Sequence, residues 1–210
     1  MLAKRNINNR FPRVDLKPLL ANYTTGSLGI EREKKSRVVM MYFGSSIGNF
    51  LPEERRALLD HLRAQLRPGD MLLLGVDLIK DTRLLLPAYD DADGTTAAFN
   101  LNILARINRE LNADFDLENF MHVARWNGHE ERVEMHLESK VEQYVRISTT
   151  GDKPMGIHFE AGETIHTESS YKFTSKRISD ELERSGFRQV EMWQDPESLF
   201  GLSLSEAMMP

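Results

Sequence analysis

The chain has 210 residues, a formal net charge of −5 and a pI near 5.7, which argues against nucleic acid or an acidic membrane as a partner, because both attract basic patches. It contains no cysteine, which excludes disulfides, thiolate metal sites and cysteine nucleophiles and fits a cytoplasmic protein. Its first residues lack the apolar core of a signal peptide, and no apolar stretch reaches the roughly 18 residues that a membrane-spanning helix needs.

The first part of the chain predicts strands alternating with a helix. Residues 14–23 have the composition of an edge strand, and the apolar run at 37–43 predicts a buried strand. A helix is expected from Pro52 to Leu66, followed by a second buried strand at 71–79. Two strands joined by one helix form a βαβ unit, so we expect a parallel sheet.

The pattern changes after residue 80. Residues 94–111 predict a helix with a broad apolar face, and a β-rich stretch follows at 131–173. A helix at 175–186 and strands at 187–195 and 201–207 then return to the α/β pattern. The economical interpretation is one α/β layer interrupted by an insertion of about 90 residues.

The loop after the first buried strand contains Gly44-Ser45-Ser46-Ile47-Gly48, which matches the G-x-S-x-G pattern of a serine hydrolase. Three residues separate Gly48 from the helix start at Pro52, so the turn is too long for a nucleophile elbow, and we expect that Ser46 does not attack. A loop at the carboxyl end of a parallel strand is a usual place to bind a small ligand. The alternative is an ordinary connection whose glycines serve only its turn.

The segment TIHTESSYKF predicts a strand with one polar face. Alternation places Thr164, His166, Glu168 and Ser170 on the same side, so that Glu168 and Ser170 could reach into one pocket. The alternative is a solvated outer face. No histidine pair has the spacing of a helical metal-ligand pair, and His136 and His166 are interpreted as polar-face residues of strands. We therefore expect no metal.

Several long segments, taken in order, resemble the histidine-specific Nα-methyltransferases of ergothioneine biosynthesis. The similarity runs from about residue 12 to about residue 205, over FGSSIGNF, LLLGVDLIKD, AYDDADGTTAAFNLNILARINRELNADFDLENF, HVARWN, RVEMHL, GETIHTESSYKF and GFRQVEMWQD. The resemblance implies a partial Rossmann-like class I S-adenosylmethionine (SAM) methyltransferase sheet at 1–80 and 174–210, with an inserted α+β substrate-binding subdomain at 81–173. The implied reaction transfers three methyl groups in succession to the α-amino nitrogen of histidine, giving hercynine.

The resemblance also implies which residues contact L-histidine or a similar amino acid. Asn49 matches an asparagine that binds the backbone groups of the amino acid, Tyr89 a tyrosine that holds its carboxylate, and Thr96 a threonine near the amine. Glu168 and Ser170 match the pair that recognises the imidazole. Met135 is expected to pack beside the ring. No catalytic residue is singled out, because the reaction mainly requires positioning.

For the cofactor SAM, the resemblance implies contacts from Gly44 and Ser45 and from Asn22 and Tyr23. Asn22 stands where the family has an aspartate that receives the adenine amino group, and Tyr23 where it has an aromatic residue. No glycine-rich SAM loop precedes this point, since the chain starts about where a third strand is expected. We therefore expect the carboxyl-terminal two-thirds of such an enzyme, completed by an N-terminal chain or by self-association.

Two alternatives to a histidine methyltransferase stay open. One is a non-catalytic remnant that keeps the histidine pocket. The other is a methyltransferase for another amino acid, such as tryptophan, against which Met135 and Glu168 favour histidine.

Overall fold

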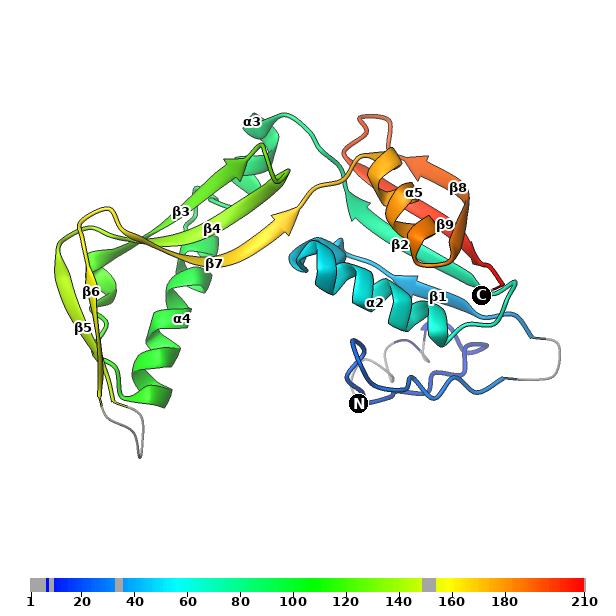
Figure 1. Ribbon diagram of the computed structural model, residues 1–210, viewed down its shortest axis with the longest axis horizontal. Helices are drawn as coiled ribbons and strands as arrows, with labels where there is room; N and C mark the ends of the chain where they lie inside the picture. Colours follow the sequence, from blue (N-terminus) through cyan, green and yellow to red (C-terminus); the bar gives the residue numbers. More distant parts are fainter. Residues whose placement is uncertain (1–6, 8–9, 33–35, 149–153, 210) are drawn as a thin grey trace.

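The computed structural model describes residues 7, 10–32, 36–148 and 154–209. It has the predicted α/β fold, built on a mixed four-stranded sheet with a three-stranded and a two-stranded sheet beside it. Figure 1 shows these sheets in two groups of elements, linked by the chain before α3 and by β7, which runs from one group toward the other. Within the described ranges, no helix is long and apolar enough to cross a membrane.

The four-stranded sheet contains the predicted βαβ unit. β1 (Val39–Tyr42) and β2 (Met71–Asp77) pair in parallel, and the short helix η1 (Ser46–Asn49) and then α2 (Pro52–Ala64) connect them. Proline at the first position of α2 loses no helical hydrogen bond, which explains why the helix begins there.

The C-terminal residues complete this sheet. After α5 (Ser175–Arg184), β8 (Phe187–Gln194) and β9 (Phe200–Ala207) form an antiparallel pair, and β9 also pairs antiparallel with β2. The strand order is β1-β2-β9-β8, so the helix and both strands predicted from the C-terminal sequence are confirmed.

The helices α2 and α5 pack against the sheet and against each other. Arg55 of α2 is buried and donates to Glu181 of α5 over 2.7 Å. The apolar core between helices and sheet consists of Ile47, Leu59, Leu66, Leu72, Leu74, Val76, Leu78, Tyr171, Phe173, Ile178, Leu182, Phe187 and Ala207. Val39 and Met41 of β1 alternate with the residues packed on this core and are 48% and 61% exposed.

The residues between β2 and α5 form the second group in Figure 1. Here α4 (Thr95–Leu111) packs on the antiparallel sheet β3-β4-β7. The remaining elements are α3 (Thr82–Leu85), η2 (Leu86–Ala88), η3 (Leu117–Asn119), β3 (Phe120–Asn127), β4 (Arg132–Ser139), β5 (Gln143–Ile147), β6 (Met155–Phe159) and β7 (Thr164–Tyr171). A second apolar cluster consists of Leu104, Phe115, Phe120, Leu137, Val145, Ile147 and Phe159. The division of the chain at residues 81 and 173 stays a prediction.

One expectation about elements is wrong, and one strand was not expected. Residues 14–23 form no strand within the described segment 10–32, and Asn22 instead begins a turn in which its carbonyl accepts from the Gly26 N–H over 2.7 Å. The strand β3 was not predicted, because its sequence FMHVARWN lacks regular alternation.

Candidate functional site

The loop after β1 is held in place at both of its ends. Gly44 and Ser45 adopt left-handed backbone angles, with φ of 77° and 55°. The Ser45 hydroxyl accepts from the backbone N–H of Asp77 over 2.8 Å, which ties the loop to the end of β2. At the other end, Arg55 donates to the carbonyl of Phe50 over 3.1 Å.

Gly48 allows the same loop to lie directly against β7. A Cβ atom added at Gly48 would stand 2.6 Å from the carbonyl oxygen of Tyr171, closer than real Cβ atoms approach backbone. Only glycine lets the two backbones meet in this way. This contact brings the next residue, Asn49, to the polar side chains of β7. Ser46 therefore belongs to a loop that positions Asn49.

A β-bulge decides which residues of β7 face this loop. Opposite β4, Glu168 pairs with Met135 but His166 pairs with His136, so Thr167 is the extra residue. The predicted single face holding His166, Glu168 and Ser170 is therefore wrong. The bulge leaves Glu168 and Ser170 together on the Met135 side and moves His166 to the other side, where its ring contacts the Ser169 hydroxyl over 3.0 Å.

Four of the predicted substrate residues come together at this point. The side-chain amide of Asn49 donates to Glu168 over 3.1 Å. The hydroxyls of Tyr89 and Ser170 share a hydrogen bond of 2.9 Å. Each residue expected to hold the backbone groups of an amino acid is thus bonded to one expected to recognise its ring.

Lys172 joins this group, although sequence reasoning missed it. Its ammonium donates to the hydroxyls of Tyr89 and Ser170 over 2.6 Å and 2.8 Å, and to the carboxylate of Asp77 over 2.9 Å. Lys80 donates to the other oxygen of Asp77. Two ammonium groups therefore surround one carboxylate. Period two could have indicated Lys172, because it continues the face of Glu168 and Ser170.

A buried pair braces the backbone of Tyr89. The Asn100 amide of α4 donates to His122 Nδ1 over 2.9 Å and to the carbonyl of His136 over 3.1 Å. Because Nδ1 accepts, Nε2 of His122 carries the hydrogen and donates to the Tyr89 carbonyl over 2.7 Å. The sequence offered no signal for this connection, since it depends on how α4 docks on β3.

The other two predicted substrate residues are Met135 and Thr96. Met135 is 6% exposed and pairs with Glu168 across the sheet, and its packing beside the imidazole ring stays a prediction. Thr96 lies in the first turn of α4, where its N–H donates to Asp91 over 2.7 Å. Hydrogen bonds from Thr96 and Thr95 hold the pKa of Asp91 well below its usual value. Thr96 makes no bond to Asn49 or Glu168 in the described part of the chain.

The expected cofactor residues fit SAM only in part. Gly44 has no heavy atom within 4 Å of an added Cβ, so its backbone is open to a ligand. The ring of Tyr23 lies 6.0 Å from that of Tyr42, at the end of β1. The side-chain oxygen of Asn22, however, accepts from both the N–H and the hydroxyl of Thr24, over 3.0 Å and 2.6 Å. In this arrangement it is not free for an adenine amino group.

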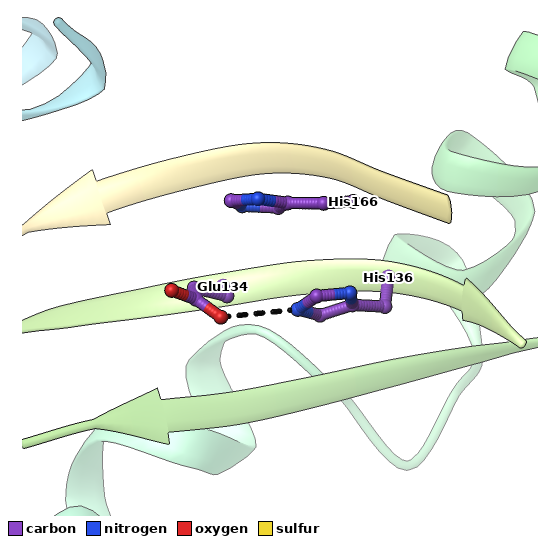
Figure 2. A group of neighbouring side chains, drawn as sticks. All are labelled: Glu134, His136 and His166. Atoms are coloured by element: carbon purple, nitrogen blue, oxygen red, sulfur yellow. Dashed lines mark hydrogen bonds and ion pairs between the residues drawn. The ribbon is translucent and has the colours of Figure 1, made fainter. Parts of the chain in front are cut away.

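Glu134, His136 and His166 form a separate cluster on the other side of the sheet (Figure 2). Their possible metal-ligand atoms lie within 4.8 Å of one another. The two rings stack, with centroids 4.7 Å apart and planes 18° apart, so their nitrogens do not converge on one point as a metal requires. The absence of a metal stays a prediction.

The carboxylate of this cluster is already engaged. Partial burial opposes its ionisation, but hydrogen bonds from Asn127, Arg132 and His136 outweigh that effect and lower the pKa of Glu134 to about 2. Burial also lowers the pKa of His136, against the opposing effect of Glu134.

Comparison with known proteins agrees with the resemblance. A family model described as "Histidine-specific methyltransferase, SAM-dependent" matches residues 2–207. A histidine N-alpha-methyltransferase of Mycolicibacterium smegmatis is 50% identical over 169 residues, covering 80% of this chain and 52% of its own length. One of Mycobacterium tuberculosis is 46% identical over 175 residues, covering 83% of this chain and 54% of its own. The chain thus spans about half the length of these relatives. A solved S-adenosylmethionine-dependent methyltransferase of Clostridium acetobutylicum is 7% identical, with a TM-score of 0.46 over 99% of this chain and 71% of its own.

Proposed function

The chain belongs to the family of SAM-dependent histidine-specific methyltransferases, and from this premise we propose that it carries the amino-acid-binding part of an enzyme that methylates the α-amino nitrogen of L-histidine. Three successive transfers give hercynine, the trimethylated product, for ergothioneine biosynthesis. In this proposal the amino acid binds where the 44–49 loop contacts β7.

One observation carries the proposal: two separate hydrogen bonds join loop residues to strand residues at one place. Asn49 meets Glu168, and Tyr89 meets Ser170. In our proposal, Asn49 and Tyr89 turn their N–H and O–H groups to the backbone groups of the amino acid. Glu168 accepts from an imidazole N–H, which an apolar side chain cannot offer.

The charges support this orientation of the ligand. Lys172 and Lys80 together exceed the single carboxylate of Asp77 by one positive charge beside Tyr89. The negative charge of Glu168 faces Asn49. An amino acid placed with its carboxylate toward Tyr89 meets the positive charge there, and its imidazole N–H meets the acceptor oxygens of Glu168.

The methyl transfer mainly requires the protein to hold the amine and the methyl donor in position. SAM supplies the methyl group when bound, and the amine attacks in line. The residues of this chain hold the amino acid so that its nitrogen has one location. Tyr23, Gly44 and Ser45 are proposed to face the cofactor. Asn22 would have to release Thr24 before its oxygen could accept from adenine.

Calorimetry of the chain with L-histidine tests the proposal. Binding of histidine and not of leucine is expected. In Glu168→Ala the affinity for histidine should fall at least about tenfold, because a hydrogen bond to a charged group contributes about 1.5–3 kcal/mol. Glu138→Ala, which removes a carboxylate of β4 that pairs with Arg125, is the matched control and should bind like the unchanged chain. Equal binding by the Glu168 variant, or equal affinity for leucine, would sink the proposal.

A further inference from the structure

Lys172 is a fully buried charged residue, with a relative exposure of 0%, and the proposed function uses only its contribution to the charge beside Tyr89. Its three partners are the hydroxyls of Tyr89 and Ser170 and the carboxylate of Asp77. An ammonium group has three protons to donate and no lone pair to accept with. All three bonds are made inside the protein, so Lys172 acts on a ligand only through its neighbours.

Lys172 changes the donor and acceptor strengths of the Ser170 hydroxyl in opposite directions. The hydroxyl oxygen of Ser170 accepts from Lys172 over 2.8 Å. A hydroxyl that accepts from a cation becomes a stronger donor and a weaker acceptor, because the hydrogen bonds polarise one another. Ser170 therefore offers its proton more readily than its remaining lone pair.

We propose that Lys172 is a positioning residue that makes Ser170 a hydrogen-bond donor and thereby selects the neutral form of an imidazole ring over the protonated form. The inference rests on the proposed function, in which histidine is the ligand. A neutral imidazole has one N–H and one nitrogen that accepts. Glu168 receives the N–H, and Ser170 donates to the other nitrogen.

The protonated ring fits less well. It carries two N–H groups, and the second would face the Ser170 hydroxyl and the positive charge of Lys172 behind it. Glu168 acts in the opposite sense, because a carboxylate favours a cation. Glu168 alone would favour the protonated ring, and Lys172 shifts the preference to the neutral ring.

Other ionisable groups lie near the site, so the test compares proteins that share them. On the side of the sheet that is proposed to bind the imidazole ring, these groups are Glu168, Tyr89, Asp77 and Lys80. On the opposite side of the sheet they are Glu134, His136 and His166. His166 contacts the Glu168 carbonyl over 3.1 Å and is present in every protein compared.

The first measurement is the affinity of the unchanged chain for L-histidine between pH 7.5 and 5.5. A ring with a pKa of about 6.5 loses roughly nine-tenths of its neutral form over this range, so the affinity should fall about tenfold. 2-Fluorohistidine, whose ring stays neutral here, reports the contribution of all other groups. Its affinity should change less than about threefold.

The second measurement assigns the effect to Lys172. In Lys172→Met the affinity for histidine should stay within about threefold between the two pH values, or rise at the lower one. Lys80→Met is the matched control, because it removes an ammonium from the same Asp77 without touching Tyr89 or Ser170. It should keep the tenfold fall. Lys172→Gln, which is neutral but keeps an amide for Asp77, should repeat the result of Lys172→Met.

The outcomes separate this inference from the proposed function. If the unchanged chain binds no histidine at any pH, both fail. If it binds histidine but a folded Lys172 variant keeps the tenfold fall, only the role of Lys172 is wrong. If thermal melts show that neither Lys172 variant folds, the residue is structural and the inference is overturned.

Discussion

Gly48 is the residue on which contact between the loop and β7 depends. We expect Gly48→Ala to push the loop away from the Tyr171 carbonyl, which an added Cβ would approach to 2.6 Å. Overpacking of this kind costs about 1–3 kcal/mol. Urea unfolding should show this loss, and histidine affinity should fall with it because Asn49 moves away from Glu168.

The control for this variant is Gly128→Ala, whose added methyl meets only the side chain of Trp126, at 3.3 Å. It should change stability by less than about 0.5 kcal/mol. Unchanged stability and binding in Gly48→Ala would contradict the close approach of loop and strand.

His136 is expected to make the protein less stable in mild acid. Burial lowers the pKa of His136 in the folded protein below the value of about 6.5 that the unfolded chain has. The unfolded chain therefore takes up the proton first, and stability falls as the pH drops below about 6.5. Melting temperatures at pH 7.5 and 5.5 should show a smaller fall in His136→Phe, which can still stack on His166.

His129 supplies the comparison for that experiment. Its side chain is 93% exposed, so His129→Gln should keep the pH dependence of the unchanged chain. The same fall in all three proteins would show that His136 is not the group responsible.

Sequence reasoning identified the polar residues of the site but not their supports. Asn49, Tyr89, Glu168 and Ser170 were all named from the resemblance, and the structure brings them into two bonded pairs. Their roles in binding stay predictions. Lys172 was missed because a lysine after a polar strand is ordinarily solvated, and only the structure shows it at 0% exposure.

Among the elements, α4 supports the site through the buried side chain of Asn100. Asn100 is 1% exposed and supports both His122 and the carbonyl of His136. Asn100→Ala should cost about 1–3 kcal/mol, because it leaves buried groups without partners. It should also weaken histidine binding, since His122 braces Tyr89. Urea unfolding and calorimetry measure the two effects.

Asn102, on the exposed side of the same helix, is the matched control. Asn102→Ala should lie within about 0.5 kcal/mol of the unchanged chain and bind histidine normally. Equal effects of the two substitutions would mean that α4 does not act through Asn100.

The elements were predictable where their pattern was local. The helices α2, α4 and α5 begin and end close to the predicted residues, because capping and apolar spacing lie within each segment. The bulge at Thr167 was not predictable, because it arises from the register of β7 against β4. Residues 14–23 have a strand-like composition, but a strand also needs a partner, and none pairs with them within the described residues.

For the molecule as a whole, we expect the 210-residue chain by itself to methylate histidine poorly. It brings four of the predicted substrate side chains together, while the Asn22 oxygen is engaged by Thr24 and no glycine-rich SAM turn is identified in its sequence. Without a fixed methyl donor, positioning is lost. Mass spectrometry of hercynine after incubation with SAM and histidine measures this.

Turnover close to that of a full-length relative would contradict the expectation. Histidine binding without turnover would favour the alternative of a binding protein. That another polypeptide, or a second copy, completes this sheet stays a prediction. Sedimentation of the chain across a concentration series tests the second copy.

In the proposed binding mode, the ligand competes with the two bonded pairs of the site for the same polar groups. A ligand that enters between Asn49 and Glu168, or between Tyr89 and Ser170, exchanges one hydrogen bond for another instead of adding new ones. An amino acid that can restore both bonds gains only modest affinity. An amino acid that cannot restore them, such as leucine, leaves charged and polar groups without hydrogen-bond partners. We expect its affinity to be reduced by the cost of these unpaired groups as well as by the missing contacts. We therefore expect this site to discriminate between amino acids without binding any of them tightly.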